Sequence, residues 1–317
     1  MKFIKLFLFY SIIILLFSLC SKNPFDSVDI NEELILFIRY GCSSELCVIR
    51  PDGSNLQVIG SHEYIMARWS PDKSKIVIVS PLGSAVGEWR YPPLWLMNMY
   101  GRILHQLTPQ GSDPVWSHDG EYILFQGGYK FVASVNIDGT GTKAIYEAED
   151  STSFHLSDIS ASGEYILGTE DLYYTNEEGK RANTDNEIVK IHLETGEKVY
   201  LTDNELSDGC PRYNRDETMI AYLCIDIPGE VTVNNIENVY VMSSDGSNKR
   251  RVTNETIPNE IWPFMAWSPD GKKIAFQKMY KIKYNSDIFI VDIDTSELFQ
   301  LTDTAKDGVR NIVMDWK

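Results

Sequence analysis

The sequence predicts an all-β fold, a six-bladed β-propeller whose blades are four-stranded and antiparallel. Two observations carry this prediction. An aromatic or apolar anchor enters a turn rich in Ser, Pro, Asp and Gly, and a second Asp/Gly turn follows it between apolar runs. The anchors recur about every 43 to 54 residues, which is the period of a propeller blade. They are Trp69, Trp116, Ile159, Tyr213, Trp267 and Trp316.

The first turn of each unit is clearest at 267–276, which reads Trp-Ser-Pro-Asp-Gly-Lys-Lys-Ile-Ala-Phe. Asp is a frequent turn residue because its side chain bonds backbone amides close to it in the chain. We therefore interpret the repeated carboxylates as turn-forming, with calcium binding as the alternative. They are Asp52, Asp72, Asp119, Asp138, Asp245 and Asp270.

The second turn separates two further strands in each unit. Asp-Gly between apolar runs, as in 135–139, favours a tight hairpin because Gly adopts positive φ without steric cost. The strand after this turn often ends in Leu-Thr or Val-Thr, as at Thr202 and Thr302. Each unit therefore reads strand a, turn, strand b, loop, strand c, turn, strand d.

The first and last units are incomplete in complementary ways. Leu34 to Gly60 supplies strands b, c and d, and Asn311 to Trp316 supplies one strand a. We expect the C-terminal strand to complete the N-terminal blade and close the ring. Closure protects the sheet edges, which otherwise invite aggregation.

The repeats leave one propeller domain at 34–317, after a signal-like segment at 1–19 and a tether at 20–33. Lys2 and Lys5 precede an apolar run of about fourteen residues, shorter than the roughly twenty of a membrane-spanning helix. Cys20 follows at once, and the segment resembles a bacterial lipoprotein signal. That resemblance implies acylation of Cys20. Ordinary cleavage or a retained anchor is the alternative, and Ser21 in place of Asp favours the outer membrane.

The net charge of −16 makes nucleic acid and anionic lipid surfaces poor partners, because both need clustered Lys and Arg. We expect membrane contact through the lipid anchor alone. The acidity is interpreted as a solubility feature, with binding of cations or of a basic partner as the alternative.

Setting Cys20 aside leaves an even number of cysteines, which in an exported chain permits disulfides. The repeat pattern places Cys42 and Cys47 at one loop and Cys210 and Cys224 on neighbouring strands. We predict both bridges, with free thiols packed as small apolar side chains as the alternative.

No motif for catalysis or metal binding stands out. A serine hydrolase needs Gly-x-Ser-x-Gly, and 41–45 lacks the final Gly. The chain has no Cys-x-x-Cys pair, and its five His fall at unrelated repeat positions. We predict a protein that is not an enzyme and that needs no metal or cofactor; a metal-dependent propeller lyase is the weaker alternative.

The b–c loops are long and individual, whereas the a–b and c–d turns are short and alike. Loops on a rigid scaffold carry function disproportionately, and Trp, Tyr and Arg dominate binding hot spots. We expect the binding face there, the alternative being that these side chains cover blade edges. The candidates are Trp89, Arg90, Tyr91, Tyr173, Tyr174, Tyr280 and Tyr284.

The repeat, above all 267–276, resembles the TolB-like, WD-type propeller family of bacterial envelopes across nearly all of 34–317. TolB has an additional N-terminal domain, which we do not expect in the 21–33 segment. The resemblance implies an exported, periplasmic or surface-facing interaction module in the cell envelope. We expect a lipid-anchored propeller that binds an envelope protein; a receptor for a carbohydrate (glycan) or another small ligand is the alternative.

Overall fold

The described part of the chain is built almost entirely from β-strands, with a single short 3-10 turn at Ala305–Asp307. This computed structural model describes residue 29 and residues 31–82, 92–149, 152–175, 181–225, 237–254, 264–280 and 285–317, apart from the side chains of 172–175 and 181–185. Within those ranges no helix has the length and apolar character needed to span a membrane.

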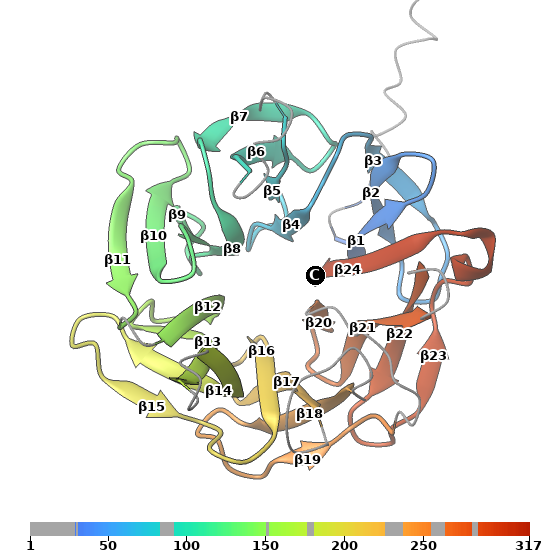
Figure 1. The fold of residues 1–317 in the computed structure, drawn as a ribbon. Coiled ribbons are helices and arrows are strands. Elements are labelled where there is room, and N and C mark those ends of the chain that lie inside the picture. The colour runs from blue at the N-terminus through green and yellow to red at the C-terminus, as the bar shows by residue number, and fades with distance from the viewer. Residues whose placement is uncertain are drawn as a thin grey trace, which may run out of the picture.

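Four separate sheets, each of four antiparallel strands, follow one another along the chain and around a ring (Figure 1). The first comprises β4 (Met66–Trp69), β5 (Lys75–Val79), β6 (Leu94–Asn98) and β7 (Ile103–Thr108). The second comprises β8 (Ser112–Trp116), β9 (Tyr122–Gln126), β10 (Phe131–Asn136) and β11 (Lys143–Glu147).

The third and fourth sheets repeat this order, with strand a innermost and strand d at the outer rim. The third comprises β12 (Thr152–Ile159), β13 (Tyr165–Thr175), β14 (Arg181–His192) and β15 (Lys198–Tyr200). The fourth comprises β16 (Ser207–Tyr213), β17 (Met219–Ile225), β18 (Glu237–Ser243) and β19 (Arg250–Arg251).

The remaining described strands form one eight-stranded sheet that contains both ends of the propeller. One half comprises β20 (Met265–Trp267), β21 (Lys273–Tyr280), β22 (Asn285–Asp292) and β23 (Leu298–Gln300). The other half comprises β24 (Arg310–Trp316), β1 (Ile35–Tyr40), β2 (Ser44–Ile49) and β3 (Gln57–Gly60).

The strand pairing corrects the predicted number of separate blades. Four blades stand alone in the described residues, where the sequence predicted six. The difference arises at the seam, where a parallel contact between Ser286 of β22 and Arg310 of β24 joins two antiparallel sets. The predicted closing pair is confirmed, because β24 pairs antiparallel with β1 from Ile35–Trp316 to Tyr40–Arg310.

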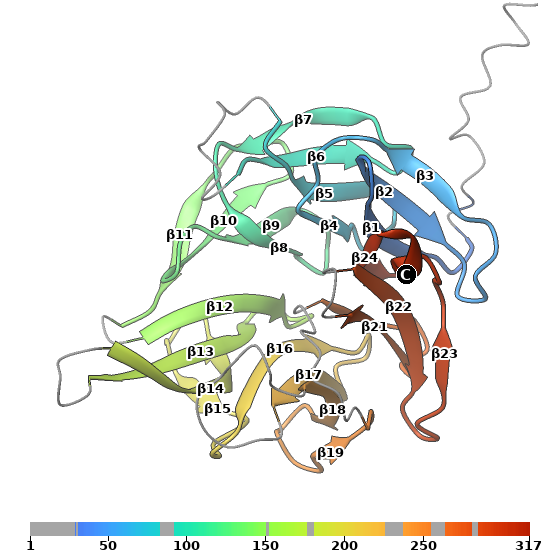
Figure 2. The same ribbon diagram turned by 45° about the vertical axis from the view of Figure 1, so that its right-hand side comes forward.

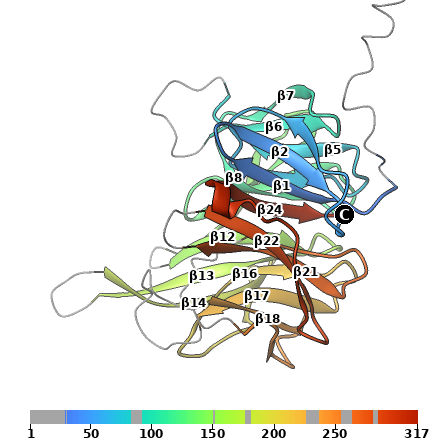
Figure 3. The same ribbon diagram turned by 90° about the vertical axis from the view of Figure 1, so that its right-hand side faces the viewer.

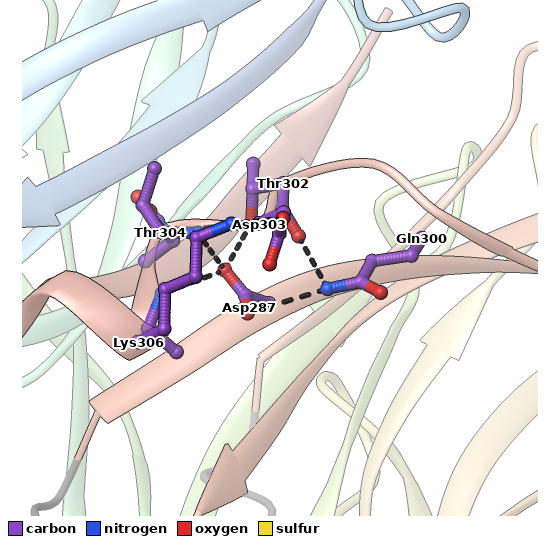
Figure 4. Close-up of polar contacts among 8 residues, drawn as sticks. Asp287, Gln300, Thr302, Asp303, Thr304 and Lys306 are labelled. Atoms are coloured by element: carbon purple, nitrogen blue, oxygen red, sulfur yellow. Dashed lines mark hydrogen bonds and ion pairs between the residues drawn. The ribbon is translucent and has the colours of Figure 1, made fainter.

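A buried carboxylate holds the chain on its way into β24 (Figure 4). Asp287 Oδ1 accepts hydrogen bonds from the Thr302 hydroxyl at 3.0 Å and from the backbone N–H groups of Thr304 at 2.9 Å and Ala305 at 3.2 Å. Asn311 of β24 donates to the Thr304 hydroxyl at 2.7 Å. This network fixes the loop that delivers the closing strand.

The a–b turns repeat one hydrogen-bonding scheme, which explains the Ser-x-Asp pattern. Ser117 Oγ donates to Asp119 Oδ1 at 2.7 Å and accepts from the N–H of Tyr122 at 3.0 Å. Asp119 Oδ1 also accepts from the N–H of Glu121 at 3.0 Å. The bond from Ser117 lowers the pKa of Asp119. The interpretation of this Asp as turn-forming is confirmed, since its carboxylate is bonded within its own turn.

The Leu-Thr and Val-Thr endings also have a structural reason. Thr253 Oγ1 accepts from the N–H of Val239 at 2.9 Å and donates to Asn238 Oδ1 at 3.0 Å. Thr202 makes the same bond with the N–H of Ile188 at 2.8 Å. Strand d is short and has ended at this point. The threonine hydroxyl therefore accepts the hydrogen bond of a backbone N–H of strand c that strand d no longer reaches.

The two predicted disulfides are not formed among the four cysteines that the structure describes. Cys42 is exposed in the hairpin turn, whereas Cys47 lies in the core opposite Phe37. Cys224 pairs across the sheet with Asp208, because β16 has a bulge between Gly209 and Arg212. The bulge displaces Cys210 from the position opposite Cys224.

Candidate functional site

The predicted binding-face residues fall mostly outside the described part of the chain. Tyr280 is described, at the end of β21, and its side chain is 39% exposed. The backbone of Tyr173 and Tyr174 lies in β13, paired with Asn183 and Ala182 of β14, but their side chains are not described. The candidates outside the described residues are Trp89, Arg90, Tyr91 and Tyr284, as is the lipidation candidate Cys20.

The hairpin of β13 and β14 is longer than the other strand pairs and projects from the body of the ring (Figures 2 and 3). The two strands stay paired as far as Thr175 and Arg181. Their register shifts once, between Leu172 and Tyr173. The projecting end is the b–c side of this sheet, so it enlarges the face on which the sequence predicted binding.

On this side of the ring, four polar residues lie close enough to interact, and we call them the b–c mouth: Asp113, His155, Asp171 and Cys210. His155 Nε2 lies 2.9 Å from Asp171 Oδ2, and this hydrogen bond raises the pKa of His155 despite its burial. Burial raises the pKa of Asp113, although Ser112, His155 and Arg68 oppose that effect.

Two residues of the b–c mouth occupy bulges of their strands. Asp113 and Cys210 have φ of 48° and 56°, in the left-handed region, where β8 and β16 each shift register. A bulge redirects side chains relative to a regular strand, which is why such positions often lie beside binding sites. The N–H of Cys210 donates to Thr169 Oγ1 at 3.1 Å and so ties this bulge to the neighbouring sheet.

An exposed aromatic side chain borders the same cluster. Tyr129 lies in the b–c loop between β9 and β10, is 56% exposed, and packs edge-on against His155 with ring centroids 6.4 Å apart. Sequence reasoning missed both residues, because His155 was interpreted as an ordinary strand residue. The sequence feature that could have identified His155 is its position near the start of a strand a, on the b–c side.

The opposite side of the ring holds a cavity of about 520 Å³, lined by the a–b turns and the ends of the innermost strands. We call it the a–b funnel. Figure 1 shows the C-terminal end of β24 at its centre. No site was predicted here, because these turns are short and stereotyped.

The residues immediately before the anchors give the a–b funnel a two-fold pattern. Around the ring they read Asp315, Arg68, Val115, Asp158, Arg212 and Ala266, so that opposite positions carry the same type of side chain.

Each of these aspartates bridges two sheets. Asp158 accepts from the N–H groups of Tyr213 and Ile159, both at 3.0 Å. Asp315 accepts from those of Trp69 at 3.0 Å and Trp316 at 2.9 Å. Burial raises the pKa of Asp158 to about 6, against the opposing effect of Arg68.

Among the described residues there is no group of three or more His, Cys, Asp or Glu placed to hold a metal ion. The b–c mouth offers carboxylates and a histidine, and the a–b funnel offers guanidinium and ammonium groups beside aromatic rings.

No family model and no curated protein matches the chain. Solved structures do share its fold. TolB from Acinetobacter baumannii gives a TM-score of 0.65 at 15% identity, over 91% of this chain and 67% of that protein. A TolB candidate from Agrobacterium tumefaciens gives 0.61 at 15% identity, over 89% of this chain and 98% of that protein. In its fold, the chain is a TolB-like propeller.

Enzymes also share the arrangement. The oligogalacturonate lyase from Vibrio parahaemolyticus gives a TM-score of 0.51 at 15% identity, over 85% of this chain and 72% of that protein. At such identities the likeness concerns the fold alone, and one fold hosts binding modules and enzymes alike.

Proposed function

We propose that the protein is an exported, lipid-anchored and non-enzymatic propeller that binds a protein partner in the cell envelope through its b–c face. The observation that carries this proposal is the β13–β14 hairpin, which projects beside the b–c mouth. A projecting hairpin next to a cluster of polar side chains gives a partner two features to contact on one face. The likeness to TolB propellers supports an interaction role over catalysis.

We infer that the propeller has six blades. The eight-stranded sheet consists of two antiparallel sets joined at one parallel contact, Ser286 with Arg310. Counted as two blades, it adds to the four separate ones. The six anchors of the sequence repeat support the same number, since each ends an innermost strand.

The partner presents a basic segment to the b–c mouth. Asp113 and Asp171 supply negative charge there, and the whole protein carries a net charge of −16. Complementary charge of this kind speeds encounter and selects partners more than it raises affinity. Binding should therefore weaken as salt concentration rises.

Anchoring rests on Cys20, which lies outside the described residues. Metabolic labelling with an alkyne fatty acid tests it on the full-length protein. We expect label on the wild type and none on Cys20→Ala, which should also leave the membrane fraction. Label that persists on Cys20→Ala would contradict lipidation at Cys20. It would leave the proposed partner binding unaffected.

The partner is tested by cross-linking the full-length protein in cells and identifying what co-purifies. The variant set combines Tyr280→Ala and Tyr129→Ala with Trp89→Ala and Arg90→Ala. The matched control is Tyr100→Ala, an exposed aromatic in a c–d turn on the opposite face. We expect one envelope protein to be lost with the b–c variants and kept with the control. Capture that is equal in all samples would sink the proposal.

A carbohydrate ligand is the second candidate, favoured by the exposed rings of Tyr129 and Tyr280 on the same face. Such a ligand would raise the melting temperature in a dose-dependent way, because it binds the folded state alone. A glycan panel that protects the wild type and not Tyr129→Ala would favour this function over a protein partner.

A further inference from the structure

The indole N–H groups around the a–b funnel differ in a way that the repeat does not predict. Trp116 Nε1 donates to the carbonyl of Arg68 at 3.0 Å, and Trp267 Nε1 donates to the carbonyl of Arg212 at 2.9 Å. In each case the acceptor is the residue directly before the anchor of the neighbouring sheet: Arg68 before Trp69, and Arg212 before Tyr213. Trp69 and Trp316 hold equivalent positions, yet their indole N–H groups have no hydrogen-bond partner among the described residues.

These unpartnered groups are buried and share one chemical character. Trp69 is 2% exposed and Trp316 is 3% exposed, and both line the funnel. Arg212 Nε and the Tyr213 hydroxyl, also in the lining, are likewise buried without a partner. Three of the four atoms can only donate, and the fourth is a hydroxyl. Buried donors are nearly always paired in folded proteins, so a cluster of them calls for an acceptor.

Four carboxylates line the funnel: three of them already accept backbone N–H groups, and the fourth is Glu33. Asp158 and Asp315 each bind two backbone N–H groups, and Glu217 accepts from the N–H of Ala161. The donors therefore belong to residues of a lining in which Asp158, Asp315 and Glu217 already accept other hydrogen bonds.

Positive charge gathers at the same place in an otherwise acidic protein. Burial lowers the pKa of Lys73; the charge of Glu33 opposes that effect, and the charges of Lys317 and Arg215 add to it. Deeper in the funnel, Arg68 and Arg212 occupy opposite positions of the two-fold pattern. Like charges repel, so an anion between the two arginines would relieve whatever repulsion Asp158 and the other lining carboxylates do not offset.

We propose that the a–b funnel binds a small molecule that carries a carboxylate or phosphate group, held by Arg68 and Arg212 with the indole N–H groups of Trp69 and Trp316 as neutral donors. Charge-assisted hydrogen bonds to such oxyanions are among the strongest that side chains make. A cavity of about 520 Å³ suits a small organic anion rather than a protein surface. This site lies opposite the b–c face, so it can fail while the proposed partner binding stands, and the reverse also holds.

Calorimetry and thermal unfolding of the full-length protein with citrate, inorganic phosphate and neutral glycerol test the proposal and separate the two anion chemistries. We expect saturable binding of one anion with a Kd below about 1 mM, a rise in melting temperature, and no effect of glycerol. Arg68→Gln and Arg212→Gln should each weaken binding by about tenfold or more. Lys143→Gln, an exposed lysine on β11, is the charge control and should bind like the wild type.

Four Trp→Phe variants separate ligand binding from structure, because each removes one N–H and keeps the ring. Trp69→Phe and Trp316→Phe should lose affinity severalfold while the free protein keeps its stability. Trp116→Phe and Trp267→Phe should lose about 1 kcal/mol of stability, since they break a bond to a carbonyl, and keep the affinity. Weak binding of every anion, unchanged in Trp69→Phe, Trp316→Phe and the Arg variants, would mean an adventitious ion only and overturn the site.

Discussion

At the residue scale, the contact between His155 and Asp171 determines how the b–c mouth responds to pH. The hydrogen bond from Asp171 raises the pKa of His155 above its usual value near 6.5, and the charge of Asp113 acts in the same direction. The imidazolium form therefore persists to higher pH in the folded protein than in the unfolded chain. Its contribution to stability is present in full below pH 6.5 and is lost as pH rises through the folded pKa.

Asp171→Asn should lower the pKa of His155, because it removes the bonded carboxylate and leaves the charge of Asp113 alone to oppose the effect of burial. The measurement is a two-dimensional NMR titration of the histidine ring protons in both proteins. Equal midpoints for His155 would show that the contact does not exist in solution.

The anchors could be predicted from the sequence and the charged residues beside them could not. Trp69, Trp116 and Trp267 recur with fixed spacing because each must fill the same gap between sheets. Arg68 and Asp158 follow no such rule, since the position before the anchor faces the funnel and no packing constraint selects its side chain. The two-fold pattern emerges once the ring brings residues from opposite blades to one axis.

At the scale of elements, the c–d turn at Gly101 is a tight contact between neighbouring sheets. Gly101 has φ of 85°, and a Cβ there would lie 1.5 Å from the carbonyl oxygen of Ile59. Gly101→Ala should therefore cost about 3–5 kcal/mol of unfolding free energy, from left-handed strain and a backbone clash together.

Gly196 is the matched control for that substitution. Its φ is 72°, but nothing lies within 4 Å of the added Cβ. Gly196→Ala should cost about 1–2 kcal/mol, the strain alone. Denaturant unfolding of the three proteins measures both values, and equal losses at the two positions would contradict the close contact at Ile59.

Thr253 tests the role of the Val-Thr ending. Thr253→Val keeps the shape of the side chain but leaves the buried N–H of Val239 and the side chain of Asn238 without this bond. We expect a loss of about 2 kcal/mol in unfolding free energy by denaturant titration. Thr142→Val, at an exposed position in a c–d turn, should change stability by less than about 0.5 kcal/mol.

The disulfide prediction was wrong for a reason that belongs to this scale. Equal distance from a turn places Cys210 and Cys224 opposite each other in a regular hairpin. The bulge between Gly209 and Arg212 breaks that rule, and no residue pattern in β16 marks it. Strand existence and order follow from apolar runs and turns, whereas local register depends on contacts with the next sheet, such as the bond from Cys210 to Thr169.

At the scale of the whole molecule, Asp287 holds the loop that closes the ring. Asp287→Ala would leave the N–H groups of Thr304 and Ala305 without their acceptor and should cost about 3 kcal/mol. Hydrogen exchange measured by mass spectrometry should show faster exchange in β24 and β1 than in β8–β11. Asp294→Ala, 77% exposed, is the control and should leave exchange unchanged. Uniform loss of protection would contradict a local role at the seam.

The propeller class and the closing strand followed from the sequence because both depend on repeated, local patterns. The fusion of two strand sets into one sheet did not, because it depends on one contact between Ser286 and Arg310 across the seam. The face of the b–c loops was predictable from loop length. The funnel on the other face was not, since it is formed by turns that look alike in every unit.

The pairing of β1 with β24 also has a consequence for how the chain reaches its folded state. These partners lie at opposite ends of the propeller sequence, so β1 keeps an open edge until the last strand has been made. Contacts this distant in sequence slow folding, and an unpaired edge is prone to intermolecular pairing meanwhile. A chain permuted to begin at Arg310, with Trp316 linked to Leu34, would pair these strands first and should refold faster with less aggregation.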